Sequence, residues 1–301
     1  MELDAYKDFR SGFVAIVGAP NVGKSTLLNR MLGQKISITS KKPQTTRNRI
    51  LGVLDRPGTQ FVFLDTPGVH HASKPLNERI VEVALSALAD VDLILVMADA
   101  AAPQPEAEQF MVEKLSARSK TPAILALNKI DKVEKAALLD QIDRWSRRHE
   151  FKSIVPVSAL RGLQVDELVD AMAAALPQGP PLYPPGSLTD MPERFIAGEL
   201  IREKAFRLTG EEIPYSVAVT VEDFKEEKAG GLIRIHATIH VERDSQKGMV
   251  IGKGGRKLKE IGQAARGEIE RMVGTKVFLK LFVRVQKNWS KDTKALQRFG
   301  Y

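Results

Sequence analysis

A glycine-rich stretch near the N-terminus has the residue types that bind a phosphate chain. Residues 18–25 read GAPNVGKS, which fits the pattern GxxxxGK[ST] after the apolar run 13–17 and before a helical pattern. In such a loop backbone N–H groups surround phosphate oxygens, the lysine reaches the β- and γ-phosphates, and the serine hydroxyl ligates Mg²⁺. The predicted phosphate-site residues are Gly18, Ala19, Pro20, Asn21, Val22, Gly23, Lys24, Ser25 and Thr26.

A second segment has the composition of a phosphate sensor. Residues 65–68 read DTPG and directly follow an apolar run at 60–64. After a phosphate loop, the carboxylate of this segment holds Mg²⁺ through water, and the glycine amide lies where it can sense a γ-phosphate. The predicted site residues here are Asp65, Thr66, Pro67, Gly68 and Val69.

The polar, basic segment 34–48 holds two adjacent threonines, Thr45 and Thr46. It follows the helix after the phosphate loop, where a switch segment supplies a threonine hydroxyl to Mg²⁺ and becomes ordered around the γ-phosphate. The sequence does not separate the two threonines, and we favour Thr46. The predicted metal ligands are therefore Ser25, Thr46 and Asp65.

A third segment, residues 128–131, has the composition of a site that recognises the base of a nucleotide. It has the sequence NKID and follows the apolar run 123–127. Guanine offers two parallel donors to a carboxylate, whereas adenine presents an acceptor at N1, and sites built on hydrogen bonds reject mismatched analogues strongly. We therefore predict guanine specificity from Asp131, with Ser158 or Ala159 donating a backbone N–H to the guanine O6. The predicted base-site residues are Asn128, Lys129, Ile130, Asp131, Ser158 and Ala159.

The elements that must position these residues alternate in type. Short apolar runs lie at 13–17, 61–64, 93–98, 123–127 and 154–157, and helical patterns at 106–115, 134–148 and 165–176. Continuously apolar strands separated by helices are typical of a mostly parallel sheet covered on both faces. The runs 50–54 and 60–64 predict one antiparallel hairpin at an edge. We predict an α/β P-loop GTPase domain over residues 1–178.

A change of composition follows this domain. Five prolines fall within nine residues, a density that neither a helix nor a central strand tolerates. We predict a semi-rigid proline-rich linker over residues 179–190. Beyond it, over residues 191–301, the patterns follow the order α-β-β-α-α-β, which predicts a smaller α+β domain of the type II KH class.

A second glycine-rich loop lies inside this domain, where residues 250–255 read VIGKGG between two helical patterns. Glycine places no Cβ in the way of a nucleic-acid backbone, and the apolar groove of a KH domain holds about four unstacked bases. We expect Val250 and Ile251 to line that groove. The predicted RNA-binding residues are Val250, Ile251, Gly252, Lys253, Gly254, Gly255, Lys257 and Lys259.

Charge supports the RNA prediction. The chain has a formal net charge of +8, and residues 247–301 alone carry 14 Lys and Arg against four acidic residues. We expect the outlying cations Arg266, Lys280, Arg284 and Lys287 to widen the electrostatic footprint. We expect His236 and His240 to be surface residues, and Trp289 either stacks on a base or anchors the tail.

The composition also excludes several classes of protein. There are no cysteines, so disulfides, thiolate chemistry and cysteine-bound zinc are excluded. The longest apolar run, 93–98, is far shorter than the roughly 20 residues of a membrane span, and the N-terminus has no apolar stretch of signal-peptide type. We therefore expect an intracellular protein.

The chain resembles the Era family of bacterial ribosome-assembly GTPases over essentially its whole length. The resemblance rests on the motif sequences GAPNVGKS, QTTR, DTPG and NKID and on the KH-like tail that follows them. The resemblance implies a cytoplasmic monomer that cycles between GTP and GDP with Mg²⁺. It also implies binding to the 3′ region of small-subunit ribosomal RNA, action on the pre-ribosomal small subunit, and in some members weak peripheral contact with the membrane.

Catalysis is the least determined part of the prediction. Val69 stands where Ras-like switches carry a water-orienting glutamine, so we expect slow intrinsic hydrolysis. His70 or His71 could replace that glutamine. In related GTPases an asparagine at the position of Asn21 helps to hold K⁺, which acts like an arginine finger. The predicted catalytic residues are Lys24, Asn21 and Thr46.

Three other readings stay open. An RNA-binding adaptor with a structural nucleotide would show no turnover. A tRNA-modifying GTPase has similar sequences in its switch segments, but the absence of cysteine and the presence of the RNA-binding tail argue against this class. A membrane-surface GTPase would place the basic tail on anionic lipid.

Overall fold

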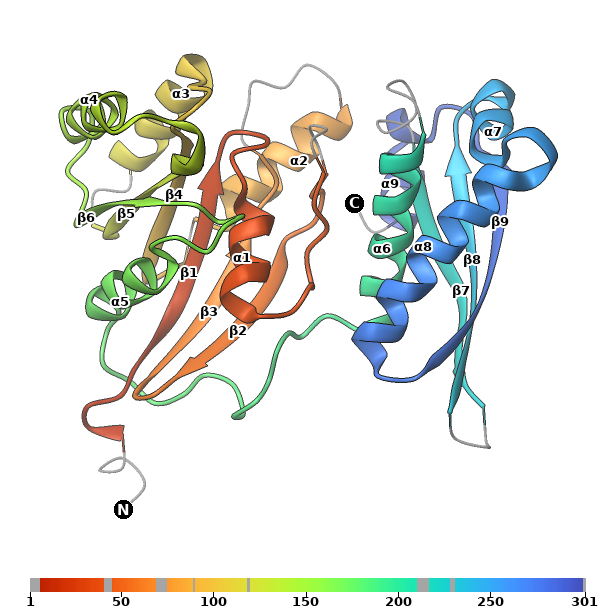
Figure 1. The fold of residues 1–301 in the computed structure, drawn as a ribbon, viewed down its shortest axis with the longest axis horizontal. Helices are drawn as coiled ribbons and strands as arrows, with labels where there is room; N and C mark the ends of the chain where they lie inside the picture. The colour runs from red at the N-terminus through yellow and green to blue at the C-terminus, as the bar shows by residue number, and fades with distance from the viewer. Residues whose placement is uncertain are drawn as a thin grey trace. The chain divides into compact units, whose positions relative to one another are not determined.

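The structure is a computed structural model of the 301-residue chain and describes residues 6–40, 45–68, 75–88, 90–117, 120–209, 217–227 and 231–299. The chain divides into two compact units (Figure 1). The first unit extends to Asp190, and the second begins at Met191. Described residues of Ile38–Thr45 and Lys74–Leu76 group with the second unit.

A six-stranded sheet in the order β2-β3-β1-β4-β5-β6 forms the centre of the first unit. Its strands are β1 (Arg10–Gly18), β2 (Ile50–Arg56), β3 (Thr59–Asp65), β4 (Leu93–Asp99), β5 (Ala123–Asn128) and β6 (Ser153–Val157). Only the β2–β3 pair is antiparallel, and β2 lies at an edge. Every residue of β3, β4 and β5 is buried, as expected of strands covered on both faces. The predicted fold class and the edge hairpin are confirmed.

Helices cover both faces of this sheet. They are α1 (Lys24–Leu32), α2 (Pro75–Ser86), α3 (Pro105–Ser116), α4 (Lys135–Ser146) and α5 (Val165–Ala175). Figure 1 shows α1 and α5 on one face and α2 and α3 on the other. Met111 of α3 and Trp145 of α4 pack with strand residues such as Val17 and Val96 in one core cluster. The carboxyl ends of β1, β3 and β5, where the predicted site residues lie, are thereby held in fixed positions.

The proline-rich segment is held against the edge of this sheet. The Gln60 side chain accepts hydrogen bonds from the amides of Leu182 and Tyr183 at 2.7 and 2.9 Å. Farther along, the Val53 amide donates to the Leu188 carbonyl at 2.8 Å. The prolines remove backbone donors, so polar side chains of the sheet and the remaining amides of the segment supply the contacts. The segment therefore follows the edge strand β2.

The second unit has the predicted order α-β-β-α-α-β, followed by a short C-terminal helix. Its elements are α6 (Glu193–Leu208), β7 (Ala218–Glu226), β8 (Leu232–Val241), α7 (Asp244–Ile251), a 3₁₀ turn (Lys253–Gly255), α8 (Arg256–Val273), β9 (Lys276–Val285), a 3₁₀ turn (Trp289–Lys291) and α9 (Thr293–Arg298). The strand order is β7-β8-β9, with β7 antiparallel and β9 parallel to β8.

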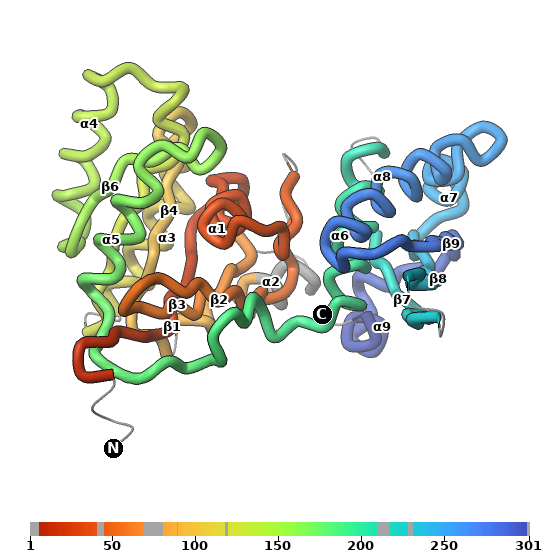
Figure 2. Tube along the Cα trace, turned by 60° about the horizontal axis from the view of Figure 1, so that its bottom comes forward, coloured from red at the N-terminus to blue at the C-terminus, as the bar shows by residue number. Residues whose placement is uncertain are grey.

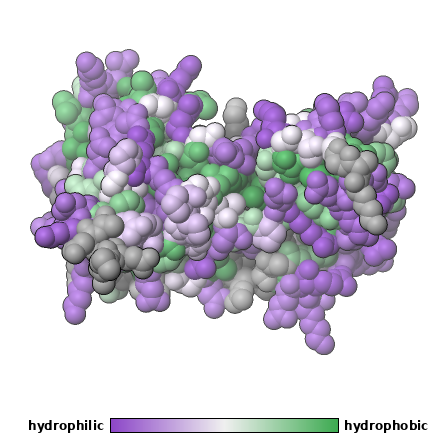
Figure 3. Space-filling model, turned by 90° about the horizontal axis from the view of Figure 1, so that it is seen from below, coloured by the Kyte–Doolittle hydropathy of each residue, from purple (hydrophilic) through white to green (hydrophobic). Residues whose placement is uncertain are grey.

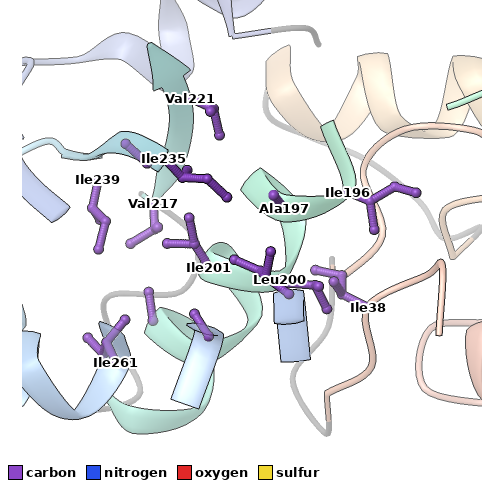
Figure 4. Close-up of a cluster of buried hydrophobic side chains, with 14 of the residues drawn as sticks. Ile38, Ile196, Ala197, Leu200, Ile201, Val217, Val221, Ile235, Ile239 and Ile261 are labelled. Carbon is purple, nitrogen blue, oxygen red and sulfur yellow. The ribbon is translucent and has the colours of Figure 1, made fainter. Parts of the chain in front are cut away.

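One face of the three-stranded sheet packs against α6 and α8. Alternate residues of β8, from Ile233 to Val241, meet Leu200 and Ile201 of α6 and Ile261 of α8 in one apolar cluster (Figure 4). Ile38 belongs to the same cluster and is 2% exposed. In this way a residue from the first part of the sequence completes the core of the second unit.

The opposite face of the sheet is partly covered by the C-terminal tail. Trp289 is fully buried and contacts the ring of Phe299, which also lies against His240. In Figure 2, α9 lies on the other side of the sheet from α8. The tail-anchor alternative for Trp289 is thus confirmed. The prediction that His240 is a surface residue is wrong, because this helix covers it and leaves it 5% exposed.

Hydrophilic side chains occupy most of the visible face of each unit in Figure 3. Among the helices that the structure describes, none is long and apolar enough to cross a membrane.

Candidate nucleotide site and candidate RNA groove

The glycines of the loop at residues 18–25 are required by close packing as well as by backbone shape. Gly18 has a φ of 154°, and a Cβ there would lie 2.3 Å from the carbonyl oxygen of Met97. Gly23 has a φ of 106°, and its Cβ would lie 2.4 Å from Nδ2 of Asn128. A side chain at position 18 would therefore require strand β4 to move, and one at position 23 would displace the Asn128 amide group and strain the left-handed backbone.

Lys24 begins α1 and turns its ammonium group back into the loop. Its Nζ donates to the carbonyl oxygens of Gly18 and Ala19, each at 3.0 Å. The side chain is 6% exposed, and this burial lowers the pKa of Lys24 to about 8, although the nearby Asp65 opposes the shift. A buried cation with a lowered pKa is suited to receive a phosphate, which would restore the charged form.

The three predicted metal ligands lie together. Ser25 Oγ donates to Oδ2 of Asp65 at 2.7 Å, and the hydroxyl of Thr46 lies 2.9 Å from that of Ser25. Ser37 Oγ also donates to Oδ2 of Asp65 at 2.7 Å. The other carboxylate oxygen, Oδ1, is buried and has no hydrogen-bond partner among the residues that the structure describes.

Burial raises the pKa of the Asp65 carboxyl, against the hydrogen bonds from Ser37 and Ser25 and the charge of Lys24. Together with the hydroxyls of Ser25 and Thr46, this desolvated carboxylate oxygen forms a set of hard oxygen ligands of the kind that Mg²⁺ takes. The residues present therefore fit the ion. The geometry favours Thr46 over Thr45, because Thr46 is the threonine whose hydroxyl reaches Ser25.

The rest of the second segment closes on the phosphate loop. Thr66 Oγ1 donates to the carbonyl oxygen of Ile16 at 2.7 Å and is fully buried. A Cβ on Gly68 would lie 2.7 Å from Cα of Pro20. Pro67 joins these two anchored positions, so the segment is packed directly against the loop. Val69, His70 and His71 lie outside the described residues.

The base-reading segment is braced by its asparagine. Asn128 Nδ2 donates to the Val22 carbonyl at 2.7 Å, and its Oδ1 accepts from the Ala159 amide at 2.9 Å. Asp131, in a 3₁₀ turn (Ile130–Lys132), is exposed, and its Oδ1 accepts from Ser158 Oγ at 2.6 Å. This geometry orients a carboxylate toward solvent at the carboxyl end of β5, where a base could meet it.

Two contacts of this segment were not predicted from the sequence. The amides of both candidate donors to the guanine O6 are engaged, Ser158 with the Leu163 carbonyl and Ala159 with Asn128. Lys129 forms an ion pair with Asp99, a residue that sequence reasoning missed. Asp99 is the last residue of β4, and a carboxylate at the end of an apolar strand is the sequence feature that could have pointed to it.

The second glycine-rich loop borders a groove of about 440 Å³ between α8 and β9. The residues that line it come from the loop end, one side of α8 and the middle of β9: Gly255, Leu258, Lys259, Gly262, Gln263, Arg266, Leu279, Lys280 and Leu281. The φ angles of Gly252, Gly254 and Gly255 are 70°, 62° and 78°. In the described part of the chain, Cβ atoms on Gly254 and Gly255 would meet nothing within 4 Å, so these two glycines face open space.

The groove contains part of the predicted RNA-binding set. Gly255 and Lys259 line it, together with the outlying cations Arg266 and Lys280. Val250 does not, because it is fully buried in the core of the unit, and its expected place in the groove wall is a wrong prediction. Ile251, one residue farther around the helix, is half-buried. Lys257 forms an ion pair with Glu260 at 2.9 Å.

These features define a P-loop GTPase joined to a KH domain, and comparisons with known proteins agree. Residues 13–129 match the family of 50S ribosome-binding GTPases, and residues 212–290 match the KH domain. GTPase Era of Geobacter metallireducens is 57% identical, with 97% of this chain and 98% of the relative covered. GTPase Era of Syntrophus aciditrophicus is 49% identical, with 97% and 95% covered.

Solved structures give the same result. Aquifex aeolicus Era bound to GDP and AlF₄⁻ is 43% identical, covers 97% of this chain and 99% of its own, and superposes with a TM-score of 0.93. A structure of Era with MgGDPNP and nucleotides 1506–1542 of 16S ribosomal RNA has the same identity, coverage and TM-score. The chain belongs to the Era family of GTPases.

Proposed function

We propose that this GTPase is a molecular switch that binds the 3′ region of small-subunit ribosomal RNA and acts in small-subunit assembly and rRNA maturation. The observation that carries the proposal is the groove between α8 and β9, which combines apolar walls, a glycine loop and the cations Lys259, Arg266 and Lys280. A groove of this kind suits unstacked bases with phosphates at its rim. A relative binds a 16S fragment, which supports ribosomal RNA as the ligand.

In the nucleotide site each residue has a distinct role. The loop amides and Lys24 bind the phosphates, and the exposed carboxylate of Asp131 accepts the guanine donors. Ser25 and Thr46 would ligate Mg²⁺, with Asp65 holding it through water. When bound, the ion neutralises charge on the β- and γ-phosphates.

We propose that hydrolysis depends on K⁺ held with the help of Asn21. Asn21 is exposed with a φ of 62°, and its carbonyl accepts from Lys129 Nζ at 2.8 Å, so the bend that presents its side chain is fixed. Turnover should be faster in K⁺ than in Na⁺ at equal ionic strength, and Asn21→Ala should abolish the difference. Equal hydrolysis rates in the two salts would contradict the K⁺ hypothesis and leave His70 and His71 as the candidate water-orienting residues.

The experiment for the whole proposal uses one preparation of the full chain. Phosphate release from GTP and binding of a labelled fragment matching nucleotides 1506–1542 should both be observed. RNA binding without turnover would instead indicate an adaptor with a structural nucleotide. Flotation with anionic liposomes, with and without that RNA, tests whether a cytoplasmic monomer also makes peripheral membrane contact through the same cations.

A further inference from the structure

The edge strand β9 alternates between two environments. Val277, Leu279, Leu281, Val283 and Val285 pack against the core of the second unit. The residues between them point to the opposite face of the sheet, away from α6 and α8. We call this second set the outer β9 stripe: Lys276, Phe278, Lys280, Phe282 and Arg284.

The stripe exposes two aromatic rings between cations. Phe278 is 51% and Phe282 45% exposed. The Lys280 ammonium lies 5.1 Å from the centroid of the Phe282 ring. Rings four residues apart on a strand lie about 13 Å from each other. Burying two rings this open would be favourable for any ligand with flat faces.

The positive charge of the stripe is not compensated. Within the described part of the chain, no carboxylate lies within ion-pair distance of Lys276, Lys280 or Arg284. The neighbouring strand is different, because Arg234 on β8 lies 3.7 Å from Asp223 and 3.4 Å from Glu227. The stripe is therefore a line of open cations beside a neutralised strand.

This composition favours a nucleic acid over a protein partner. Lysine is depleted in protein–protein interfaces, and the apolar area here is divided into two rings by a lysine. Surfaces that bind single strands combine cations along the backbone with aromatic rings on which bases stack, as do the sheets of RRM domains.

The stripe is also continuous with the groove. Leu279 and Leu281 form one wall of the groove, and Lys280 contributes to its lining as well. The strand β9 thus separates the two surfaces by the thickness of one backbone. A single strand that leaves the groove over this edge reaches Phe278 and Phe282 next.

We infer that the outer β9 stripe is a second RNA-binding surface, on which bases of a single strand leaving the groove stack on Phe278 and Phe282 while Lys280 and Arg284 contact its phosphates. The inference rests on the RNA binding proposed above. It places this second RNA contact on the face of the sheet opposite to the one that carries Leu279 and Leu281 of the groove wall.

The test is titration of the labelled 1506–1542 fragment with full-length variants at several salt concentrations. Replacing both rings, F278L/F282L, should weaken binding about tenfold or more for the loss of each stacked base, with the salt slope unchanged because no cation is lost. The matched variant F278Y/F282Y keeps the rings and should bind like the wild type. Arg284→Gln, which removes a cation of the stripe that does not line the groove, should reduce the salt slope by about 0.7 for a single-stranded contact.

Gly254→Asp, in the groove loop, separates the two proposals. If it abolishes binding while F278L/F282L binds like the wild type, the groove stands and the stripe inference is wrong. If Gly254→Asp binds like the wild type, the proposed groove itself fails. If F278L/F282L changes only the sedimentation of the protein and not RNA affinity, the stripe is a contact between copies of the chain, which also overturns the inference.

Discussion

The two glycine-rich loops of this chain, at residues 18–25 and 252–255, both place a lysine beside glycines at the start of a helix. In the first loop the glycines are enclosed, and a Cβ on Gly18 or Gly23 would collide with Met97 or Asn128. In the second, Cβ atoms on Gly254 and Gly255 would meet nothing. The lysines differ in the same way, since Lys24 is buried and Lys253 is exposed.

From this difference we expect the two loops to bind phosphate in different ways. The enclosed loop is pre-organised by its own protein contacts, which favours tight binding of one small polyphosphate. The open loop keeps its shape through positive φ angles and leaves its surface to a passing backbone, as suits a long polymer. We therefore expect changes at the first loop to act through packing and protonation, and changes at the second to act through the ligand.

The largest effect should come from breaking base recognition. Asp131→Asn replaces the acceptor of both guanine donors with an amide that presents one donor, so GTP affinity should fall by orders of magnitude. The same variant should favour xanthosine triphosphate, whose C2 carbonyl suits the amide donor. Fluorescent nucleotide competition measures both affinities, and RNA affinity without nucleotide serves as the unchanged control. Unchanged GTP affinity would disprove the assignment of Asp131.

GTP affinity should depend on pH through the protonation of Lys24, the buried lysine of the first loop. Phosphate should raise its pKa from about 8, so binding takes up a proton around and above pH 8, and GTP affinity should fall by up to about tenfold per pH unit there. At pH 7 the lysine is already charged in the free protein, and no uptake by this group is expected. Calorimetry at pH 8.5 in two buffers of different ionisation enthalpy measures the uptake. Identical heats in the two buffers would contradict it.

The last effect concerns the stability of the second unit. Burial, with Arg284 and Arg298 assisting and Glu222 opposing, lowers the pKa of His240 to about 4. Between pH 6.5 and 4 the unfolded chain binds this proton and the folded one does not, so the free energy of unfolding should decrease as pH falls, by at most about 1.4 kcal/mol per unit. Melting curves of the wild type and His240→Gln should diverge in this window. Parallel curves would show that His240 does not carry the effect.

The sequence predicted those features that depend on local pattern. The phosphate loop, the edge hairpin and the α-β-β-α-α-β order follow from spacing within short segments, and the structure has them. It did not predict contacts that depend on tertiary packing. Val250 and Ile251 are adjacent and both apolar, and only the phase of α7 in the folded unit shows that Val250 enters the core. His240 alternates onto an outward face, and the covering tail has no periodic signal.

Other omissions have the same cause. Ser37 reaches Asp65 from a loop with no motif, and Leu279 becomes a groove wall only because β9 pairs parallel to β8 beside α8. Residues 179–190 have the composition of a spacer, but the Gln60 side chain binds the backbone at Leu182 and Tyr183 through a distant pairing in the sequence.

We expect the nucleotide state of the first unit and RNA binding by the second to be linked. The segment that contains Thr46, whose hydroxyl lies 2.9 Å from that of Ser25, also contains Ile38, which packs in the core of the second unit. Next to Ile38, the Thr39 amide donates to Glu203 of α6 at 3.0 Å. If this segment responds to the γ-phosphate, the RNA-binding unit must respond with it. Linkage then requires RNA to favour the same nucleotide state to the same degree.

The most direct test is titration of the 1506–1542 fragment into the wild type and Gly254→Asp, each with a non-hydrolysable GTP analogue and with GDP. We expect different RNA affinities in the two nucleotide states of the wild type. We also expect Gly254→Asp to lose RNA binding in both states while nucleotide affinity and basal hydrolysis survive, because Gly254 belongs to the second unit and the phosphate loop to the first. Identical wild-type affinities in the two states would contradict the claim and leave a GTPase and an RNA-binding domain that only share a chain.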